Sequence, residues 1–226
     1  MRSLRTERRH SRPFFLHLVQ DSARWGNGTG GSVEAMTRII AGFAGSLAIA
    51  VPPNGTRPTS DRVREAIFSA LDARDIIRGA RVLDLYAGSG ALGLEAASRG
   101  ARKVMLVERS YGAIPFTRRN AALIRKNAPR GGGLIVEVSS SPVHAFLTGS
   151  EASWDIVFLD PPYDLGNTEL VHALQVLVPR LETDATVVLE RSSRMPEPAW
   201  PDGLTLDRRK DYGDTVLYWL SPAALP

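Results

Sequence analysis

A loop with two consecutive prolines carries the clearest chemical signal in the sequence. The apolar run Asp155–Leu159 predicts a strand, and Asp160, Pro161, Pro162 and Tyr163 follow it directly. The amino group of a nucleobase is a weak nucleophile because its lone pair is delocalised into the ring. Asp160 and the Pro161 carbonyl can accept hydrogen bonds from its two N–H groups, and Tyr163 can stack on an extruded base. We interpret these four residues as a catalytic loop for the transfer of a methyl group to an amino group. Alternatively, the prolines only end the strand and Asp160 caps the next element.

A second signal is a glycine loop, Gly88 to Gly93 (GSGALG), which follows the predicted strand Arg81–Leu85. The spacing also matches the dinucleotide fingerprint, in which the loop faces a pyrophosphate. Asp84 directly before the turn would repel that anion, but it suits the ammonium and sulfonium groups of S-adenosylmethionine. Glu108, at the end of the second predicted strand, stands where an acid can bind ribose hydroxyls. For both acids, the alternative is a side chain that only stabilises the turn.

The elements that position these loops alternate along the chain. Continuous apolar strands separated by helices indicate an α/β fold with a mostly parallel sheet that is covered on both faces. The two last apolar runs flank a turn and predict an antiparallel hairpin at one sheet edge. Besides the two strands above, we expect strands at 103–107, 134–138, 186–189, 204–209 and 215–220, and helices at 91–98, 111–126 and 168–177.

The amino-terminal part divides into two segments. Residues 1–35 are rich in Arg, Gly and Ser, and we expect a disordered extension, with Met36 as an alternative start of the protein. Residues 37–51 predict a hairpin with a glycine-assisted turn, and Thr59, Ser60 or Asp61 can cap the helix that follows. We therefore expect a hairpin–helix extension over 36–78 and the main domain over 79–226.

Composition excludes several classes of protein. The 226 residues contain no cysteine and four scattered histidines, so we expect no disulfide and no metal site. No apolar run has the length of a membrane helix, and we expect a cytoplasmic protein without membrane contact. The net charge is +4, but six arginines and three acids precede Met36, so little of the excess lies in the main domain. Nine basic residues between Arg99 and Arg130 accompany one acid, which indicates either a nucleic-acid surface or a solvated helix face.

Taken together, these segments resemble the RsmD family of bacterial 16S rRNA guanine-N2 methyltransferases. The likeness runs from Met36 to the end and includes MTRIIAG, RPTSDRVREAIFSAL, LDLYAGSGALGLEAASRGA, VERS and FLDPPY. It implies a Rossmann-like class I fold, S-adenosylmethionine as cofactor, and a monomer that acts on 16S rRNA in the assembled or late-assembling small subunit. The implied activity is that of a 16S rRNA (guanine(966)-N2)-methyltransferase.

The resemblance also assigns site residues. It implies that the cofactor is bound by Asp84, Tyr86, Gly88, Gly90, Glu108, Arg109 and Ser141, and that RNA is contacted by Arg38, Arg57, Thr59, Ser60 and Arg62. One departure from the family pattern concerns the adenine. Where the family usually has an acid after the third strand, this sequence has Ser139, Ser140 and Ser141, which offer only hydroxyl groups.

Three alternatives stay open from the sequence alone. An amino-methyltransferase that acts on another nucleic acid or on protein glutamine would share the Asp-Pro-Pro-Tyr loop but would not be expected to carry RPTSDRVREAIFSAL. A nicotinamide-dependent oxidoreductase would use the glycine loop for NAD. A non-catalytic assembly factor would bind rRNA and merely retain the fold.

Overall fold

The computed structural model of the chain describes residues 35–53 and 60–223. The expectation of a disordered extension before Met36 concerns residues that, except for Ala35, lie outside this range. The expected RNA contacts of Arg57 and Thr59 also lie outside it. Within the described ranges, no helix is both long and apolar enough to cross a membrane.

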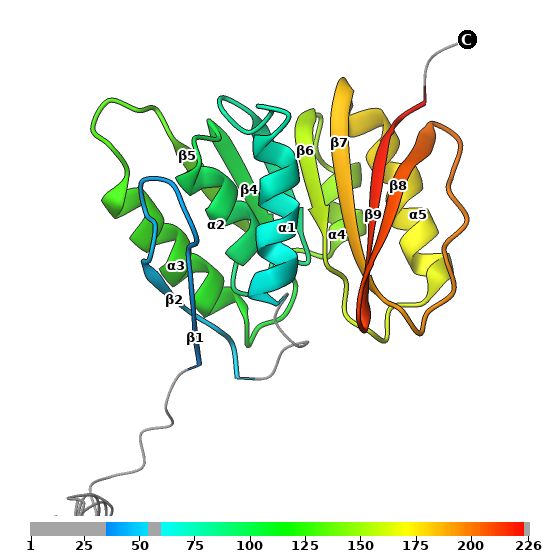
Figure 1. Cartoon of the computed structure of the whole chain (residues 1–226), viewed down its shortest axis with the longest axis horizontal. Helices are drawn as coiled ribbons and strands as arrows, with labels where there is room; N and C mark the ends of the chain where they lie inside the picture. Colours follow the sequence, from blue (N-terminus) through cyan, green and yellow to red (C-terminus); the bar gives the residue numbers. More distant parts are fainter. Residues whose placement is uncertain (1–34, 54–59, 224–226) are drawn as a thin grey trace, which may run out of the picture. The chain divides into compact units, whose positions relative to one another are not determined.

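A seven-stranded sheet with the order β5-β4-β3-β6-β7-β9-β8 forms the centre of the fold (Figure 1). Its first five strands are parallel, and β9 pairs antiparallel with both β7 and β8, so the expected mostly parallel sheet with an antiparallel carboxyl-terminal hairpin is confirmed. The strands are β3 (Arg81–Leu85), β4 (Lys103–Val107), β5 (Ile135–Ser139), β6 (Trp154–Leu159), β7 (Leu181–Ser192), β8 (Leu204–Tyr212) and β9 (Thr215–Pro222).

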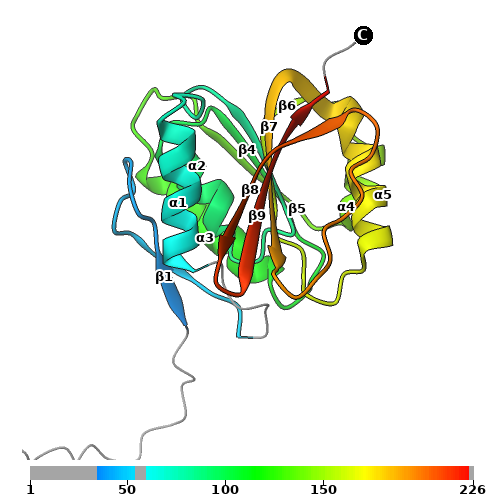
Figure 2. The same ribbon diagram turned by 45° about the vertical axis from the view of Figure 1, so that its right-hand side comes forward.

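Helices cover both faces of this sheet, as Figure 2 shows. One face packs against α1 (Asp61–Asp72), α2 (Ala91–Ser98) and α3 (Ile114–Asn127); the other packs against α4 (Val143–Thr148) and α5 (Asn167–Leu177), which continues into η1 (Val178–Arg180). Successive residues of a strand point to opposite faces, so Val82 lies in the first core and Leu83 in the second. Burial on both faces explains why the central strands are continuously apolar.

The predicted elements differ from the structure mainly at their ends. Strand β7 extends over Leu181–Ser192, well beyond the predicted 186–189, because its first residues include exposed Thr183 and Asp184 and do not form an apolar run. Helix α3 begins at Ile114 rather than at 111, since residues 111–113 form a turn, and Pro115 lies in its first turn as expected. The six-residue helix α4 was not predicted, because it is too short to show a helical period.

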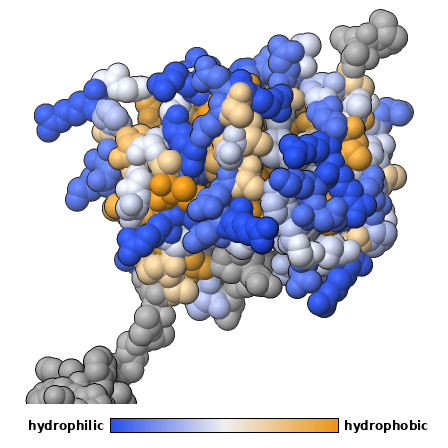
Figure 3. Space-filling model, viewed as in Figure 1, coloured by the Kyte–Doolittle hydropathy of each residue, from blue (hydrophilic) through white to orange (hydrophobic). Residues whose placement is uncertain are grey.

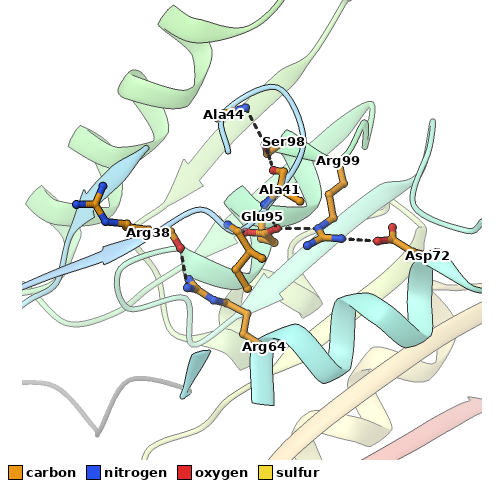
Figure 4. Close-up of polar contacts among 9 residues, drawn as sticks. Arg38, Ala41, Ala44, Arg64, Asp72, Glu95, Ser98 and Arg99 are labelled. Carbon is orange, nitrogen blue, oxygen red and sulfur yellow. Dashed lines mark hydrogen bonds and ion pairs between the residues drawn. The ribbon is translucent and has the colours of Figure 1, made fainter. Parts of the chain in front are cut away.

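The amino-terminal hairpin consists of β1 (Met36–Arg38) and β2 (Ala48–Ala50), which pair antiparallel as expected. Glu95 of α2 fastens the loop between them (Figure 4). Its fully buried carboxylate accepts hydrogen bonds from the backbone N–H groups of Ile40 (2.6 Å) and Ala41 (3.0 Å) and from Arg99 Nε (2.7 Å). Arg99 also pairs with the half-exposed Asp72 of α1. The Glu95 carboxylate thus joins the hairpin loop to helix α2 of the main domain.

Gly42 shows how close this contact is. Its φ of +82° is in the left-handed region, and a Cβ built there would lie 1.9 Å from the carbonyl oxygen of Ser98. The neighbouring Phe43 N–H donates to the same carbonyl at 2.9 Å. Only glycine lets the hairpin loop lie directly on the end of α2.

Replacing Glu95 with Gln tests this anchor. The amide has one acceptor oxygen where the carboxylate has two charged ones, and it leaves Arg99 without its buried counter-charge. We therefore expect the free energy of unfolding to fall by about 2 to 4 kcal/mol. Urea unfolding followed by circular dichroism measures the change. The matched control is Asp72→Asn, which removes the exposed partner of Arg99 and should cost less than about 1 kcal/mol. Equal losses in the two variants would contradict the anchoring role of Glu95.

Candidate active site

A cavity of about 300 Å³ lies at the carboxyl edge of the parallel strands. Strand β3 lies between β4 and β6, and the chain crosses over in opposite directions from it, which is the position where open α/β sheets bind ligands. The loops after β3, β4 and β6 all line the cavity. Of the residues predicted from the sequence, the lining includes Asp84, Tyr86, Gly88, Glu108, Arg109, Asp160 and Pro162.

The glycine loop makes hydrogen bonds to the acids that the sequence singled out. Gly88 N–H donates to Glu108 Oε2 at 2.8 Å, and Gly93 N–H donates to Asp84 Oδ2 at 2.8 Å. Gly90 N–H donates to the carbonyl of Ala87 at 2.7 Å. The three glycine N–H groups therefore have partners inside the protein, whereas a dinucleotide site presents such groups to a pyrophosphate. Two carboxylates beside the loop make an anion still less favourable.

Asp84 is buried beneath this loop, and its environment changes its acidity. The pKa of the carboxyl is raised to about 7: burial is the largest cause, the Gly93 N–H bond opposes it, and the nearby acids Asp160 and Glu108 add to the increase. Near neutral pH the group is therefore divided between its protonated and ionised forms. A cation bound in the cavity would favour the ionised form.

Tyr86 occupies an unusual backbone conformation at the start of the same loop. Its φ is +64°, in the left-handed region that residues with a Cβ rarely adopt. Such strain is concentrated at ligand-binding sites, where the surrounding structure imposes it. Burial raises the pKa of the phenol to about 12, so Tyr86 remains protonated and can act as a hydrogen-bond donor at the cavity wall.

The proline loop after β6 is held by contacts on both sides. The Pro162 carbonyl accepts a hydrogen bond from Leu165 N at 2.9 Å, and the buried Arg191 of β7 donates from Nη2 to the Leu165 carbonyl at 2.9 Å. Asp160 and Pro162 line the cavity, and Pro161 is buried. Tyr163 is not part of the cavity wall; its side chain is 49% exposed.

Several expected site residues lie apart from the cavity wall. Gly90 begins α2 in a left-handed conformation and does not line the cavity. Ser141 is also absent from the wall: its Oγ is 2.8 Å from Ser139 Oγ, and the apolar Val143 lines this side.

Three of the expected RNA-binding residues, Arg38, Ser60 and Arg62, belong to the described part of the chain; none of them lines the cavity, and two have partners. Arg38 donates to the Ser46 carbonyl within the hairpin at 3.0 Å. Ser60 caps α1 by accepting from Val63 N at 3.3 Å. Arg62 is exposed on the first turn of α1.

Two buried polar residues of α3 support the glycine loop and were missed in the sequence. Thr117 Oγ1 donates to the Gly88 carbonyl at 2.6 Å, and Asn120 Nδ2 donates to the Ser89 carbonyl at 2.8 Å. Asn120 also exchanges two hydrogen bonds with Ala50 of β2. Their spacing from the buried Ile124 places both residues on the apolar face of the helix. A polar residue on an apolar helix face is the sequence signal by which they could have been found.

Comparison with known proteins identifies the family. The model of the family described as conserved hypothetical protein 95 matches residues 37–221. The ribosomal RNA small subunit methyltransferase D of Escherichia coli K12 is 34% identical over 186 residues, covering 82% of this chain and 89% of that protein. The enzyme of the same name from Haemophilus influenzae is 31% identical over 185 residues, covering 80% and 92%.

Solved structures agree with this result. The Escherichia coli protein yhhF matches with a TM-score of 0.70 and 32% identity, covering 84% of this chain and all of that chain. A magnesium protoporphyrin IX methyltransferase from Synechocystis, solved with S-adenosylmethionine bound, shares the fold with a TM-score of 0.56 at 14% identity, covering 72% of this chain and 79% of that chain. The fold is thus that of the class I methyltransferases, and the chain belongs to the RsmD family of rRNA methyltransferases.

Proposed function

We propose that this protein transfers the methyl group of S-adenosylmethionine to the exocyclic N2 of a guanine in 16S rRNA. The observation that carries the proposal is the meeting of Asp84, Glu108 and Asp160, from three different strand ends, in one cavity. The names of the relatives support ribosomal RNA of the small subunit as the substrate. The resemblance in RPTSDRVREAIFSAL supports guanine N2 as the acceptor, at the position of guanine 966, in an assembled or late-assembling subunit.

The charges of the cavity fit a cationic cofactor. S-Adenosylmethionine supplies a methyl group on a sulfonium and also carries an ammonium, so a wall with Asp84, Glu108 and Asp160 favours it electrostatically. We assign Asp84 to the ammonium end and Glu108 to the ribose hydroxyls. Glu108 already accepts from Gly88 N and Ser110 N, but each carboxylate oxygen has a second lone-pair direction for a ligand hydroxyl. Ala113 and Val143 provide apolar contacts for the adenine.

The proline loop would orient the acceptor. Asp160 and the Pro161 carbonyl accept the two N–H hydrogens of the guanine amino group, which turns the nitrogen lone pair toward the methyl carbon. Asp160 then takes the proton that the methylated amino group releases. The exposed ring of Tyr163 offers a stacking surface for a base turned out of the RNA. Catalysis rests mainly on positioning, because the sulfonium is already an activated methyl donor.

Exposed basic residues of the segment 99–130 provide a surface for RNA, and two of them, Arg109 and Arg118, lie at the carboxyl edge of the sheet with the cavity. Of the nine basic residues between 99 and 130, Arg99 and Lys103 pair with acids. The exposed ones are Arg102, Arg109, Arg118, Arg119, Arg125, Lys126 and Arg130. Arg118 lies beside the carboxyl end of β5, where its Nη2 reaches Ser140 Oγ at 3.3 Å. We assign this surface, together with the hairpin–helix segment 36–78, to rRNA contacts, and 79–226 to methyl transfer.

Asp160→Ala tests the catalytic loop. Loss of the acceptor should lower the rate of methyl transfer to small ribosomal subunits by at least about 100-fold, since orientation of the amino group depends on it. Transfer of a radiolabelled methyl group measures the rate, and calorimetry with S-adenosylhomocysteine should show that cofactor binding persists. The matched control is Asp202→Ala, at an exposed position outside the cavity wall. A rate like that of the unmodified protein in the Asp160 variant would disprove the assigned mechanism.

The raised pKa of Asp84 predicts a pH dependence of cofactor binding. Only the ionised carboxylate attracts the ammonium, and the group takes up a proton as the pH falls through about 7. The affinity for S-adenosylhomocysteine should therefore decrease by about tenfold from pH 8 to pH 6. Calorimetric titrations across this range provide the measurement. Asp84→Asn should bind more weakly with a nearly flat profile; an unchanged slope in this variant would assign the titration to another group.

Charge reversal tests the RNA surface. Arg118→Glu should weaken binding to small-subunit particles by about tenfold at moderate salt and reduce the steepness of the salt dependence, because fewer counterions are released. Filter binding over a series of salt concentrations measures both quantities. Arg208→Glu is the control, since this exposed residue belongs to β8 at the opposite edge of the sheet, where hydrophilic residues cover the surface (Figure 3). Equal effects of the two charge reversals would contradict the assignment of the basic surface around Arg118 to rRNA contacts.

A further inference from the structure

Arg64 of α1 is a buried cation in the cavity wall. Only 1% of the residue is exposed, yet it is one of the residues that line the cavity. Its Nη2 donates to the carbonyl of Arg38 (2.6 Å), to Asp61 Oδ1 (2.9 Å) and to Thr37 Oγ1 (3.2 Å), as Figure 4 shows for Arg38. Its Nε is buried without a hydrogen-bond partner. A buried guanidinium with an unpaired donor lowers the stability of the protein, and a bound ligand that accepts a hydrogen bond from it would remove this cost.

The packing of α1 shows which part of the cavity Arg64 belongs to. The ring of Phe68 lies 5.7 Å from the ring of Phe158 in β6, two residues before Asp160. Arg64 precedes Phe68 by four residues and therefore lies on the same face of the helix, one turn nearer its amino end. The other basic residue of the described cavity wall, Arg109, is exposed and directly follows Glu108 at the end of β4. Arg64 thus belongs to the side of the proline loop, and Arg109 to the side assigned to the ribose.

The amino-acid end of S-adenosylmethionine carries a carboxylate as well as an ammonium. The acids of the cavity wall attract the ammonium but repel the carboxylate, so the carboxylate requires a cation on the same side. We propose that the guanidinium of Arg64 binds the α-carboxylate of S-adenosylmethionine. This inference rests on the proposed function, because it names a contact for the same cofactor. It also gives Arg64 a role beyond holding β1 against α1.

Decarboxylated S-adenosylmethionine isolates this contact, since it lacks only the carboxylate. The full-length protein should bind S-adenosylmethionine about 10- to 100-fold more tightly than the decarboxylated compound, which is the usual range for a buried charge-assisted hydrogen bond. In Arg64→Gln the preference should fall to about threefold or less. Arg74→Gln, the same change at an exposed position just after α1, should keep the full preference. Isothermal titration calorimetry with both compounds gives the ratio, and circular dichroism shows whether each variant is folded.

The ratio separates a binding role from a structural one. If Arg64→Gln does not fold, Arg64→Lys serves instead; it keeps the charge but not the planar fork, and its preference should be at least threefold lower than that of the unmodified protein. A folded variant that binds both compounds more weakly by the same factor would overturn the inference, because the preference would be unchanged. An unmodified protein that binds neither compound would overturn the proposed function and this inference with it.

Discussion

The hydrogen bonds between the glycine loop and its two acids determine what the cavity can bind. Gly88 and Gly93 donate to Glu108 and Asp84, and these bonds fix the loop between the ends of β3 and β4. They also use the N–H groups that a pyrophosphate would need and leave negative charge at the cavity wall. The loop shape that binds dinucleotides in other proteins is here accompanied by two acids, which favour a positively charged ligand over an anion. The raised pKa of Asp84 reflects the energetic cost of placing that carboxylate under the loop.

Other parts of the fold keep this arrangement in place. Thr117 and Asn120 bind the carbonyl groups of the loop from α3, so the loop is held through both its donors and its acceptors. Asn120 extends the connection to β2, and Glu95 fastens the loop of the same hairpin to α2. Thr37 of the hairpin and Arg64 of α1 line the cavity, so both elements contribute to its wall. We therefore expect the hairpin and the cavity to fold and unfold together, because both depend on the same set of buried and partly buried hydrogen bonds.

The fold and the loops of the site could be predicted because they depend on local patterns. Continuous apolar runs mark β3 and β4 to the residue, and strand ends followed by glycine or proline mark the loops of the cavity. Arg64, Thr117 and Asn120 could not be recognised in this way, since their roles depend on contacts between residues far apart in the sequence. A polar residue within an apolar helix face was their only local signal. Ser141 was expected at the cofactor from its position in the family pattern, but the turn after β5 directs its hydroxyl to Ser139 and leaves Val143 at the cavity.

The proposed function joins a cavity that suits a cationic methyl donor to the methylation of guanine N2 in small-subunit rRNA. The most direct measurement is mass spectrometry of nucleosides from 16S rRNA, prepared from cells with the gene, without it, and with the gene restored. If the protein has the proposed function, N2-methylguanosine should decrease by one residue per 16S rRNA without the gene and return when the gene is restored. An unchanged amount of N2-methylguanosine in cells without the gene would contradict it.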